Sequence, residues 1–202
     1  MSTSSVNYKE SNFEHPFLTK IRGEPTYETL HHLKNELKAN ASSVPITLGV
    51  GKHGKQKMIL LPAEYHLIMP TNTFTWPPNP GILVPNSDIP ATHIATAEDT
   101  HRLTRKLYLN TLLLTQTIIQ KIIEAVDTKY LAALCNPANG KITPLVPTIL
   151  NFLYVNYRRI TPQQLDDKKT TVKSMTYNPA QPIDLIFNSI DDLVKYVKAA
   201  KA

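Results

Sequence analysis

Apolar residues recur at helical spacing through most of this chain, and the longest such run lies near its middle. From Thr96 to Val126 the spacing keeps the apolar positions on one side of a helix. The stripe consists of Leu103, Leu107, Leu114, Ile118 and Ile122, and it is widened by Leu112, Ile119, Ile123 and Val126. Thr96 precedes Asp99 by three residues, a spacing typical of the capping box that starts a helix. The pattern predicts one helix of about thirty residues, roughly 45 Å long, as the centre of the fold.

Shorter segments with helical spacing lie before and after this helix, and most have their own start or stop residues. Helices are predicted over residues 25–39, 63–69, 130–134 and 146–157. The short helix at 130–134 ends at Asn136-Pro137, and a turn follows at Asn139-Gly140. Thr161-Pro162 has the form of an N-cap residue followed by the first residue of a further helix. The fold class that we expect is therefore mainly α.

The last apolar stripe follows Pro182 and alternates steps of four and three residues. It consists of Ile183, Phe187, Ile190, Val194 and Val197. Two arrangements remain open at this point: the stripe packs against the central helix, or it stays partly exposed and binds a partner. In the second arrangement, we expect self-association through Ile183, Phe187, Ile190 and Val194.

One region departs from the helical pattern. Residues 46–48 and 57–61 are short apolar runs on either side of a glycine-rich segment, which predicts one small N-terminal β-hairpin. Residues 1–24 are polar and aperiodic, so a flexible N-terminal arm is expected there. The remainder is expected to be a single helical domain, with the helix and hairpin in 25–69, a proline-rich connection in 70–95 and the helical core in 96–202.

The order of these segments and the residues in them resemble the capsid N-terminal region of the Gag polyprotein of copia-type LTR retrotransposons. The similar pieces in the second half are Asp127–Leu131 with Asn136-Pro137 and Gly140–Ile142, Ile149-Leu150 with Tyr157, Thr161-Pro162 with Leu165, and Asn178–Asp184 with Phe187 and Ile190–Leu193. Upstream, the similar pieces are Gly49–Gly54, Pro62–Tyr65, and Phe74 with Pro77, Pro80 and Gly81. The resemblance covers residues 26–197, and its specificity comes from the shared order of the pieces.

The resemblance implies a helical, capsid-like domain that self-associates, packages RNA and catalyses nothing. The chain departs from the family in having no C-x₂-C-x₄-H-x₄-C zinc knuckle and no D-[ST]-G protease signature. Arg158 also stands where a glycine often follows the tyrosine. Alternatives are a monomeric basic RNA-binding module, or a degenerate or host-adopted Gag remnant that acts as a protein-interaction domain.

The formal net charge of +6 permits contact with nucleic acid without requiring it. The candidate contacts form two basic patches, one at the predicted hairpin tip and one in the central helix: Lys52, His53, Lys55 and Lys57, and then Arg102 and Arg105. A solvated turn is the simpler interpretation of the first patch. We expect RNA binding to be weak and electrostatic. The pair Arg158-Arg159 is explained by the negative end of the preceding helix dipole.

The segment Gly49–Gly54 matches the phosphate-binding pattern G-x-G-x-x-G, but its context differs. A phosphate loop of the related Walker type needs a hydroxyl residue where this chain has Gln56, and both kinds of loop need a helix directly afterwards. Here Pro62 interrupts any helix begun at Lys55. No metal-ligand spacing or nucleophile–base pattern occurs elsewhere. We therefore expect no enzyme activity, cofactor, metal or small-molecule substrate.

Cysteine content and hydropathy bear on location. Cys135 is the only cysteine, so there is no internal disulfide framework, and a reducing, cytoplasmic location is expected. Cys135 follows Leu134 and is interpreted as a small buried apolar residue. The longest apolar stretch, residues 112–123, is interrupted by polar residues, so we expect no membrane partner.

Overall fold

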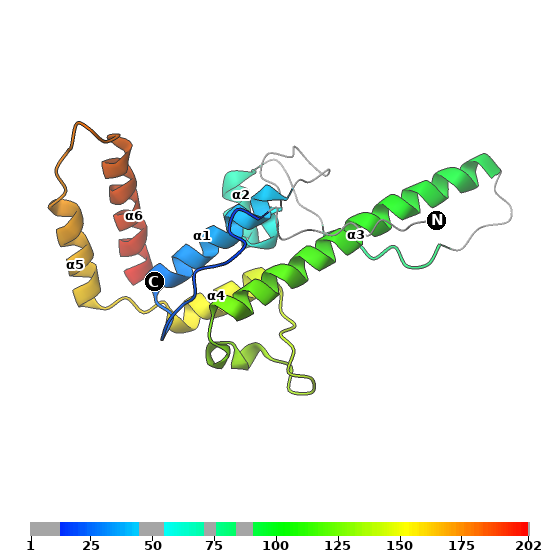
Figure 1. Ribbon diagram of the computed structural model, residues 1–202, viewed down its shortest axis with the longest axis horizontal. Coiled ribbons are helices and arrows are strands. Elements are labelled where there is room, and N and C mark those ends of the chain that lie inside the picture. Colours follow the sequence, from blue (N-terminus) through cyan, green and yellow to red (C-terminus); the bar gives the residue numbers. More distant parts are fainter. Residues whose placement is uncertain (1–12, 45–54, 71–75, 84–90, 202) are drawn as a thin grey trace.

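A computed structural model describes residues 13–44, 55–70, 76–83 and 91–201, and these residues are mainly helical, as predicted. Within them no β-strand forms. Figure 1 shows the six α-helices, which are α1 (Tyr27–Ser43), α2 (Pro62–Ile68), α3 (Ala91–Ala125), α4 (Val146–Tyr157), α5 (Pro162–Lys173) and α6 (Asp184–Lys201). Three short 3₁₀ helices connect them, η2 (Gln56–Met58), η3 (Thr128–Tyr130) and η4 (Ala132–Leu134).

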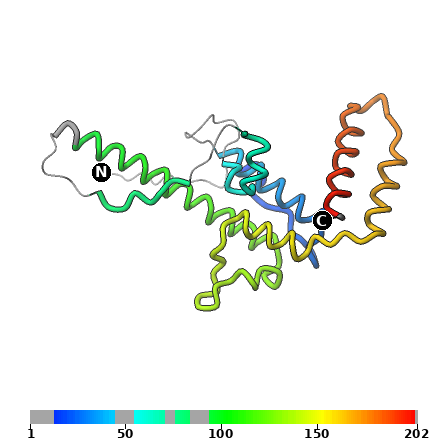
Figure 2. The backbone as a smooth tube through the Cα atoms, turned by 180° about the vertical axis from the view of Figure 1, so that it is seen from behind, coloured from blue at the N-terminus to red at the C-terminus, as the bar shows by residue number. Residues whose placement is uncertain are grey.

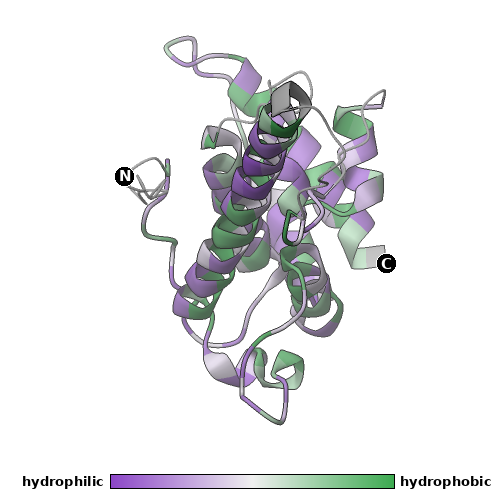
Figure 3. Ribbon diagram, turned by 90° about the vertical axis from the view of Figure 1, so that its right-hand side faces the viewer, coloured by the Kyte–Doolittle hydropathy of each residue, from purple (hydrophilic) through white to green (hydrophobic). Residues whose placement is uncertain are grey.

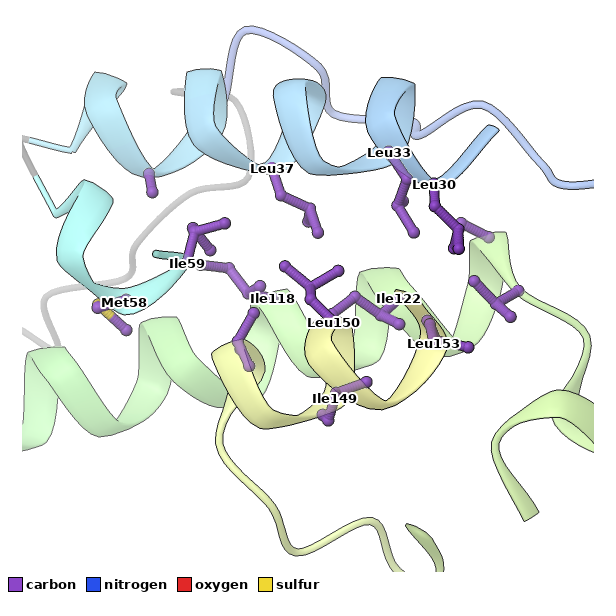
Figure 4. Packing of buried hydrophobic residues seen from close by; sticks show 14 of the residues in the cluster. Leu30, Leu33, Leu37, Met58, Ile59, Ile118, Ile122, Ile149, Leu150 and Leu153 are labelled. Atoms are coloured by element: carbon purple, nitrogen blue, oxygen red, sulfur yellow. The ribbon is translucent and has the colours of Figure 1, made fainter. Parts of the chain in front are cut away.

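The hydrophobic core lies where α1, α3 and α4 meet. Figure 4 shows Leu30, Leu33 and Leu37 of α1 facing the side chains of α3 and α4. The residues that these leucines face include Ile118, Ile122, Leu150 and Leu153, and these four residues and Ile149 are all buried. Each such side chain contributes about 1.5–3 kcal/mol when it is fully removed from water. The predicted apolar faces of these three helices therefore form one continuous core.

Helix α3 is longer than predicted, and only its second half lies in the core. It spans 35 residues, or about 52 Å, and it begins at Ala91. The predicted capping box at Thr96 is wrong, because Thr96 lies inside the helix and its carbonyl accepts the Thr100 hydroxyl at 2.8 Å. The helix continues upstream because residues 91–95 contain no breaker after Pro90.

The apolar stripe of α3 is divided by its surroundings. Leu114, Ile118 and Ile122 are buried, but Leu103 is 64% exposed. Figures 1 and 2 show the first half of α3 extending beyond α1, α2 and α4, and no other described helix lies against it. Figure 3 shows that α3 carries both hydrophobic and hydrophilic residues along its length. The same helical spacing therefore gives exposed apolar residues in the first half of α3 and buried ones in the second half.

The predicted strand at residues 57–61 is wrong. This segment begins in η2, and Met58, Ile59 and Leu60 are buried one after another rather than alternately. Consecutive burial suits a turn wedged against the core better than a strand, whose side chains alternate between two faces. The other predicted strand, at 46–48, and the glycine-rich segment 49–54 lie outside the described residues. Helix α2 starts at Pro62, as expected.

The N-terminal segment 13–24 is not a flexible arm, contrary to the sequence prediction. Phe13 and Ile21 are buried in the core cluster. The Thr19 N–H and hydroxyl donate to the Glu36 carboxylate at 3.0 and 2.8 Å. The Asn40 side chain accepts from the His15 N–H at 2.7 Å and donates to its carbonyl at 2.8 Å. Paired polar groups hold this aperiodic segment along α1, which explains why α1 buries a carboxylate and an amide.

The connection from α3 to α4 uses 3₁₀ turns where a short α-helix was predicted, in η3 and η4. The predicted turn at Asn139-Gly140 is confirmed. Gly140 adopts φ +66°, a conformation that favours glycine. The turn brings Cys135 and Ile142 into an isolated antiparallel bridge. The Cys135 side chain is half-buried, so the interpretation as a buried apolar residue holds only in part.

Candidate functional site

Helices α5 and α6 form a hairpin at the end of the molecule opposite the outer half of α3 (Figure 1). The predicted start of α5 is confirmed: Thr161 accepts from the Gln164 N–H at 3.2 Å, and Gln164 Oε1 accepts from the Thr161 N–H at 2.8 Å. Between the helices, Asn178 Oδ1 accepts from the Ala180 N–H at 3.0 Å, which closes the turn. Local signals therefore start α5 and turn the chain back into α6.

The hairpin contacts the core at the start of α1. The rings of Tyr27 and Tyr196 meet edge to face with centroids 5.2 Å apart. The Lys168 ammonium lies 3.3 Å from the Glu28 carboxylate and 5.9 Å from the centroid of the Tyr196 ring. Tyr196 is the single buried residue among the described side chains of α6. This contact attaches the hairpin near the C-terminal end of α6 and leaves the N-terminal end of α6 away from the core.

The apolar stripe of α6 is open to solvent. Ile183 is 52% exposed, Phe187 58%, Ile190 42% and Val194 45%. Ile186 and Leu193 are half-buried and fall on a neighbouring side of α6, which packs against α5. Of the two arrangements left open by the sequence, the described structure therefore has the partly exposed one. The stripe does not close on α3.

Charged residues border this stripe on the side away from the half-buried residues. Asp184 lies in the first turn of α6, Asp191 near the middle and Lys198 near the end, and all three are exposed. They share one edge of the stripe because they are seven residues apart, close to two helical turns. Asp192, on the outer face, pairs with Lys195 at 3.2 Å. The edge therefore runs from acidic to basic along the helix.

Lys55, one of the basic residues predicted to contact RNA, is not at the surface. Only 2% of it is exposed, and its Nζ donates to the Thr111 hydroxyl at 3.1 Å. Its backbone N–H donates to the Ala41 carbonyl at 2.8 Å, which fixes the residue at the end of α1 and directs the side chain toward α3. Burial lowers the pKa of the Lys55 ammonium to about 8. Its assignment as a nucleic-acid contact is therefore wrong.

The other predicted basic contacts are dispersed. Lys57 is half-buried, with its ammonium 4.9 Å from the centroid of the Tyr65 ring. Arg102 and Arg105 are exposed on the projecting half of α3, and Arg102 pairs with Asp99 at 2.9 Å. Lys52 and His53 lie outside the described residues. RNA contact stays a prediction that rests, in the described structure, on Arg102 and Arg105.

The phosphate-loop alternative lacks its helix in this structure. The glycine-rich segment itself is not described, but Lys55 leads into a 3₁₀ helix of three residues, which does not provide the row of N–H groups of a long helix start. Across the described ranges, no group of three or more His, Cys, Asp or Glu side chains is placed to hold a metal ion. None of the described helices is long and apolar enough to cross a membrane.

A second feature was missed in the sequence, where Arg158 was explained by the helix dipole alone. Arg158 follows α4, one turn beyond Tyr154, and both side chains line a groove between the core and α6. The Tyr154 hydroxyl is buried and has no hydrogen-bond partner among the described residues. No sequence signal marks this site, because its members come from helices far apart in the chain.

No family model matches this chain, and neither the curated proteins nor the solved structures contain a match to it.

Proposed function

We propose that this chain is a non-enzymatic, Gag-like structural protein that self-associates through the exposed stripe of α6. The observation that supports this proposal is the exposure of Ile183, Phe187, Ile190 and Val194 at 42–58% along one side of a well-formed helix. A contiguous apolar surface of this kind is costly in water and is typical of an interface. The resemblance of residues 26–197 to copia-type Gag supports the same function.

The occupant that suits this stripe best is a second copy of the same helix. Asp184 and Lys198 stand about four turns apart on one edge of the stripe. When two α6 helices pack antiparallel about a two-fold axis, Asp184 of each copy faces Lys198 of the other, while the apolar residues meet between them. Parallel packing about a two-fold axis would place this edge against the opposite edge of the partner's stripe, so the pairing of Asp184 with Lys198 would be lost. The charge pattern therefore favours an antiparallel dimer contact.

The test is the concentration dependence of mass, measured by sedimentation equilibrium. We expect the wild-type chain to associate, and Phe187→Asp and Ile190→Asp to remain monomeric because each places a carboxylate in the contact. The matched control is Leu103→Asp, which puts the same charge on an exposed leucine of α3 and should associate as the wild type does. Circular dichroism checks that all variants stay helical.

Charge exchange tests the antiparallel geometry. Asp184→Lys and Lys198→Asp should each weaken the dimer a few-fold, and the double variant should restore it, since exposed ion pairs contribute about 0.2–1 kcal/mol each. Asp191 lies midway, where it meets its counterpart near the axis, so Asp191→Asn should strengthen association. A chain that stays monomeric at high concentration in high salt, where charge repulsion is screened, would contradict the proposal.

A further inference from the structure

A groove of about 660 Å³ lies where α1, α2 and α4 meet the end of α6. This volume is within the usual range for sites that bind small molecules. Its apolar lining includes Ile59, Leu60 and Leu150, which also belong to the buried core or its edge. The groove is therefore preformed on one side by packed residues, and α6 closes it with Lys195 and Ala199.

The Tyr154 hydroxyl is the polar atom of this groove that most needs a partner. It is buried and makes no hydrogen bond within the described part of the chain, although the Tyr27 ring meets the Tyr154 ring edge to face with centroids 6.2 Å apart. A buried hydroxyl without a partner costs about 1–3 kcal/mol, so such groups in folded proteins are rare. Burial raises the pKa of Tyr154, so the group stays a protonated donor at neutral pH.

The charged residues that line this groove are mainly positive, with Lys34, Lys38, Arg158 and Lys195 against Glu64. Lys34 is paired with Glu64, whose other oxygen accepts from the Leu61 N–H at 2.9 Å. Lys38 and Arg158 also line the groove, and neither side chain forms an ion pair with any described residue. Among the charges that act on the pKa of the Tyr154 phenol, Glu64 adds to the rise caused by burial and Arg158 opposes it. The groove thus combines three features. The Tyr154 hydroxyl lacks a hydrogen-bond partner among the described residues, Lys38 and Arg158 form no ion pair with any of them, and one wall is apolar.

We propose that this groove binds a small amphiphilic anion, namely a phosphate or carboxylate on a short apolar stem. The anionic oxygens accept from the Tyr154 hydroxyl and pair with Arg158, and the stem lies on the wall formed by Ile59, Leu60 and Leu150. An anion suits this site because it accepts hydrogen bonds and neutralises the surrounding cations. A ligand held there also contacts α6, so its binding fixes the α5–α6 hairpin against the core. This inference stands independently of self-association.

Isothermal titration calorimetry with three probes tests the proposed chemistry. Hexyl phosphate has both the anion and the stem, hexylammonium keeps the stem but reverses the charge, and inorganic phosphate keeps the anion without the stem. We expect hexyl phosphate to bind, inorganic phosphate to bind at least tenfold more weakly, and hexylammonium not to bind. Octanoate in place of hexyl phosphate distinguishes a carboxylate source from a phosphate source. Equal binding of hexyl phosphate and hexylammonium would overturn the proposal.

Two variants locate the binding site on the protein. Tyr154→Phe removes only the unpaired hydroxyl, so it should leave the melting temperature unchanged or raise it while weakening hexyl phosphate binding about tenfold. Arg158→Gln should weaken binding to a similar extent. The matched controls are Tyr157→Phe and Arg159→Gln, whose side chains do not line the groove and whose loss should leave affinity unchanged.

Each result then decides the matter. Weaker binding in both groove variants, with both controls unchanged, supports the assignment. Hexyl phosphate that produces no heat, or that binds both groove variants as tightly as the wild type, overturns it and leaves water as the partner of the Tyr154 hydroxyl. The groove lies within one protomer, so the titrations can also be made on the Ile190→Asp variant, which is expected to stay monomeric. The test of the groove therefore does not depend on whether the chain self-associates.

Discussion

Replacing the buried Lys55 with methionine is expected to stabilise the protein at neutral pH. Lys55 is 2% exposed, and burial lowers the pKa of its ammonium from 10.5 to about 8. Methionine has a similar length, adapts to irregular space and carries no charge. Thr111 keeps its bond to the Leu107 carbonyl at 2.9 Å, so its hydroxyl is not left unpaired. We expect Lys55→Met to raise the free energy of unfolding by about 1–3 kcal/mol at pH 7.

The sign and size of the effect of Lys55 on the free energy of unfolding follow from the protons that it binds in the folded and unfolded chains. Between pH 8 and 10.5 the unfolded chain holds a proton on Lys55 more often than the folded chain does, so the stability contribution rises with pH. This contribution is lowest below pH 8 and constant above 10.5. A shift from 10.5 to about 8 corresponds to a cost of about 3 kcal/mol at pH 7. About 2 kcal/mol of this cost is removed by pH 9.5.

Urea unfolding at several pH values between 7 and 9.5 measures this effect. The advantage of Lys55→Met over the wild type should shrink by about 2 kcal/mol across the range, because titration of all other groups cancels in the comparison. Lys57→Met is the matched control: it removes a half-buried ammonium from the Tyr65 ring and should lower stability slightly. A Lys55→Met protein less stable than the wild type, or a difference constant with pH, would refute the reasoning.

Two further predictions concern stability. Ile118→Asp should abolish cooperative thermal unfolding, because Ile118 is 1% exposed and an unpaired buried carboxylate costs several kcal/mol; a normal melting curve by circular dichroism would contradict this, and Leu103→Asp on the exposed half of α3 is the control. Thr161→Ala removes the capping hydroxyl of α5 and should lower the free energy of unfolding by about 1 kcal/mol in urea titrations, whereas an unchanged midpoint would show that the cap contributes nothing.

Helix existence and most helix boundaries were predictable from local sequence. Helix α4 begins and ends at the predicted positions and α5 begins at its predicted start, because Pro and Thr at helix starts act through bonds within a few residues. The buried leucines of α1 and the buried apolar residues of α4 also fall at helical spacing, but the burial of Glu36 and Asn40 in α1 could not be predicted from spacing. Thr96 misled the prediction, because a capping spacing inside a longer helix has the same local appearance as a true start.

The candidate surfaces were predictable only in part. The stripe of α6 could be named from its spacing, but its exposure could not, because exposure depends on whether α3 or α5 covers it. Lys55 was expected in a solvated turn, and the contact with Thr111, 56 residues away in the chain, reversed that expectation. The Tyr154 groove had no sequence signal, since its walls come from four helices.

The sequence by itself determined the mainly α class, the order of the helices and which side of α1, α4 and α6 is apolar, because capping and periodicity are properties of short segments. Only the tertiary structure decided which apolar sides are covered. Identical spacing leaves Leu103 in solvent and Ile118 in the core. The aperiodic segment 13–24 is ordered by side chains of α1 that lie beyond the reach of any local pattern. Whether a side chain is buried depends on residues far away in the sequence, so it is decided only when those segments pack together.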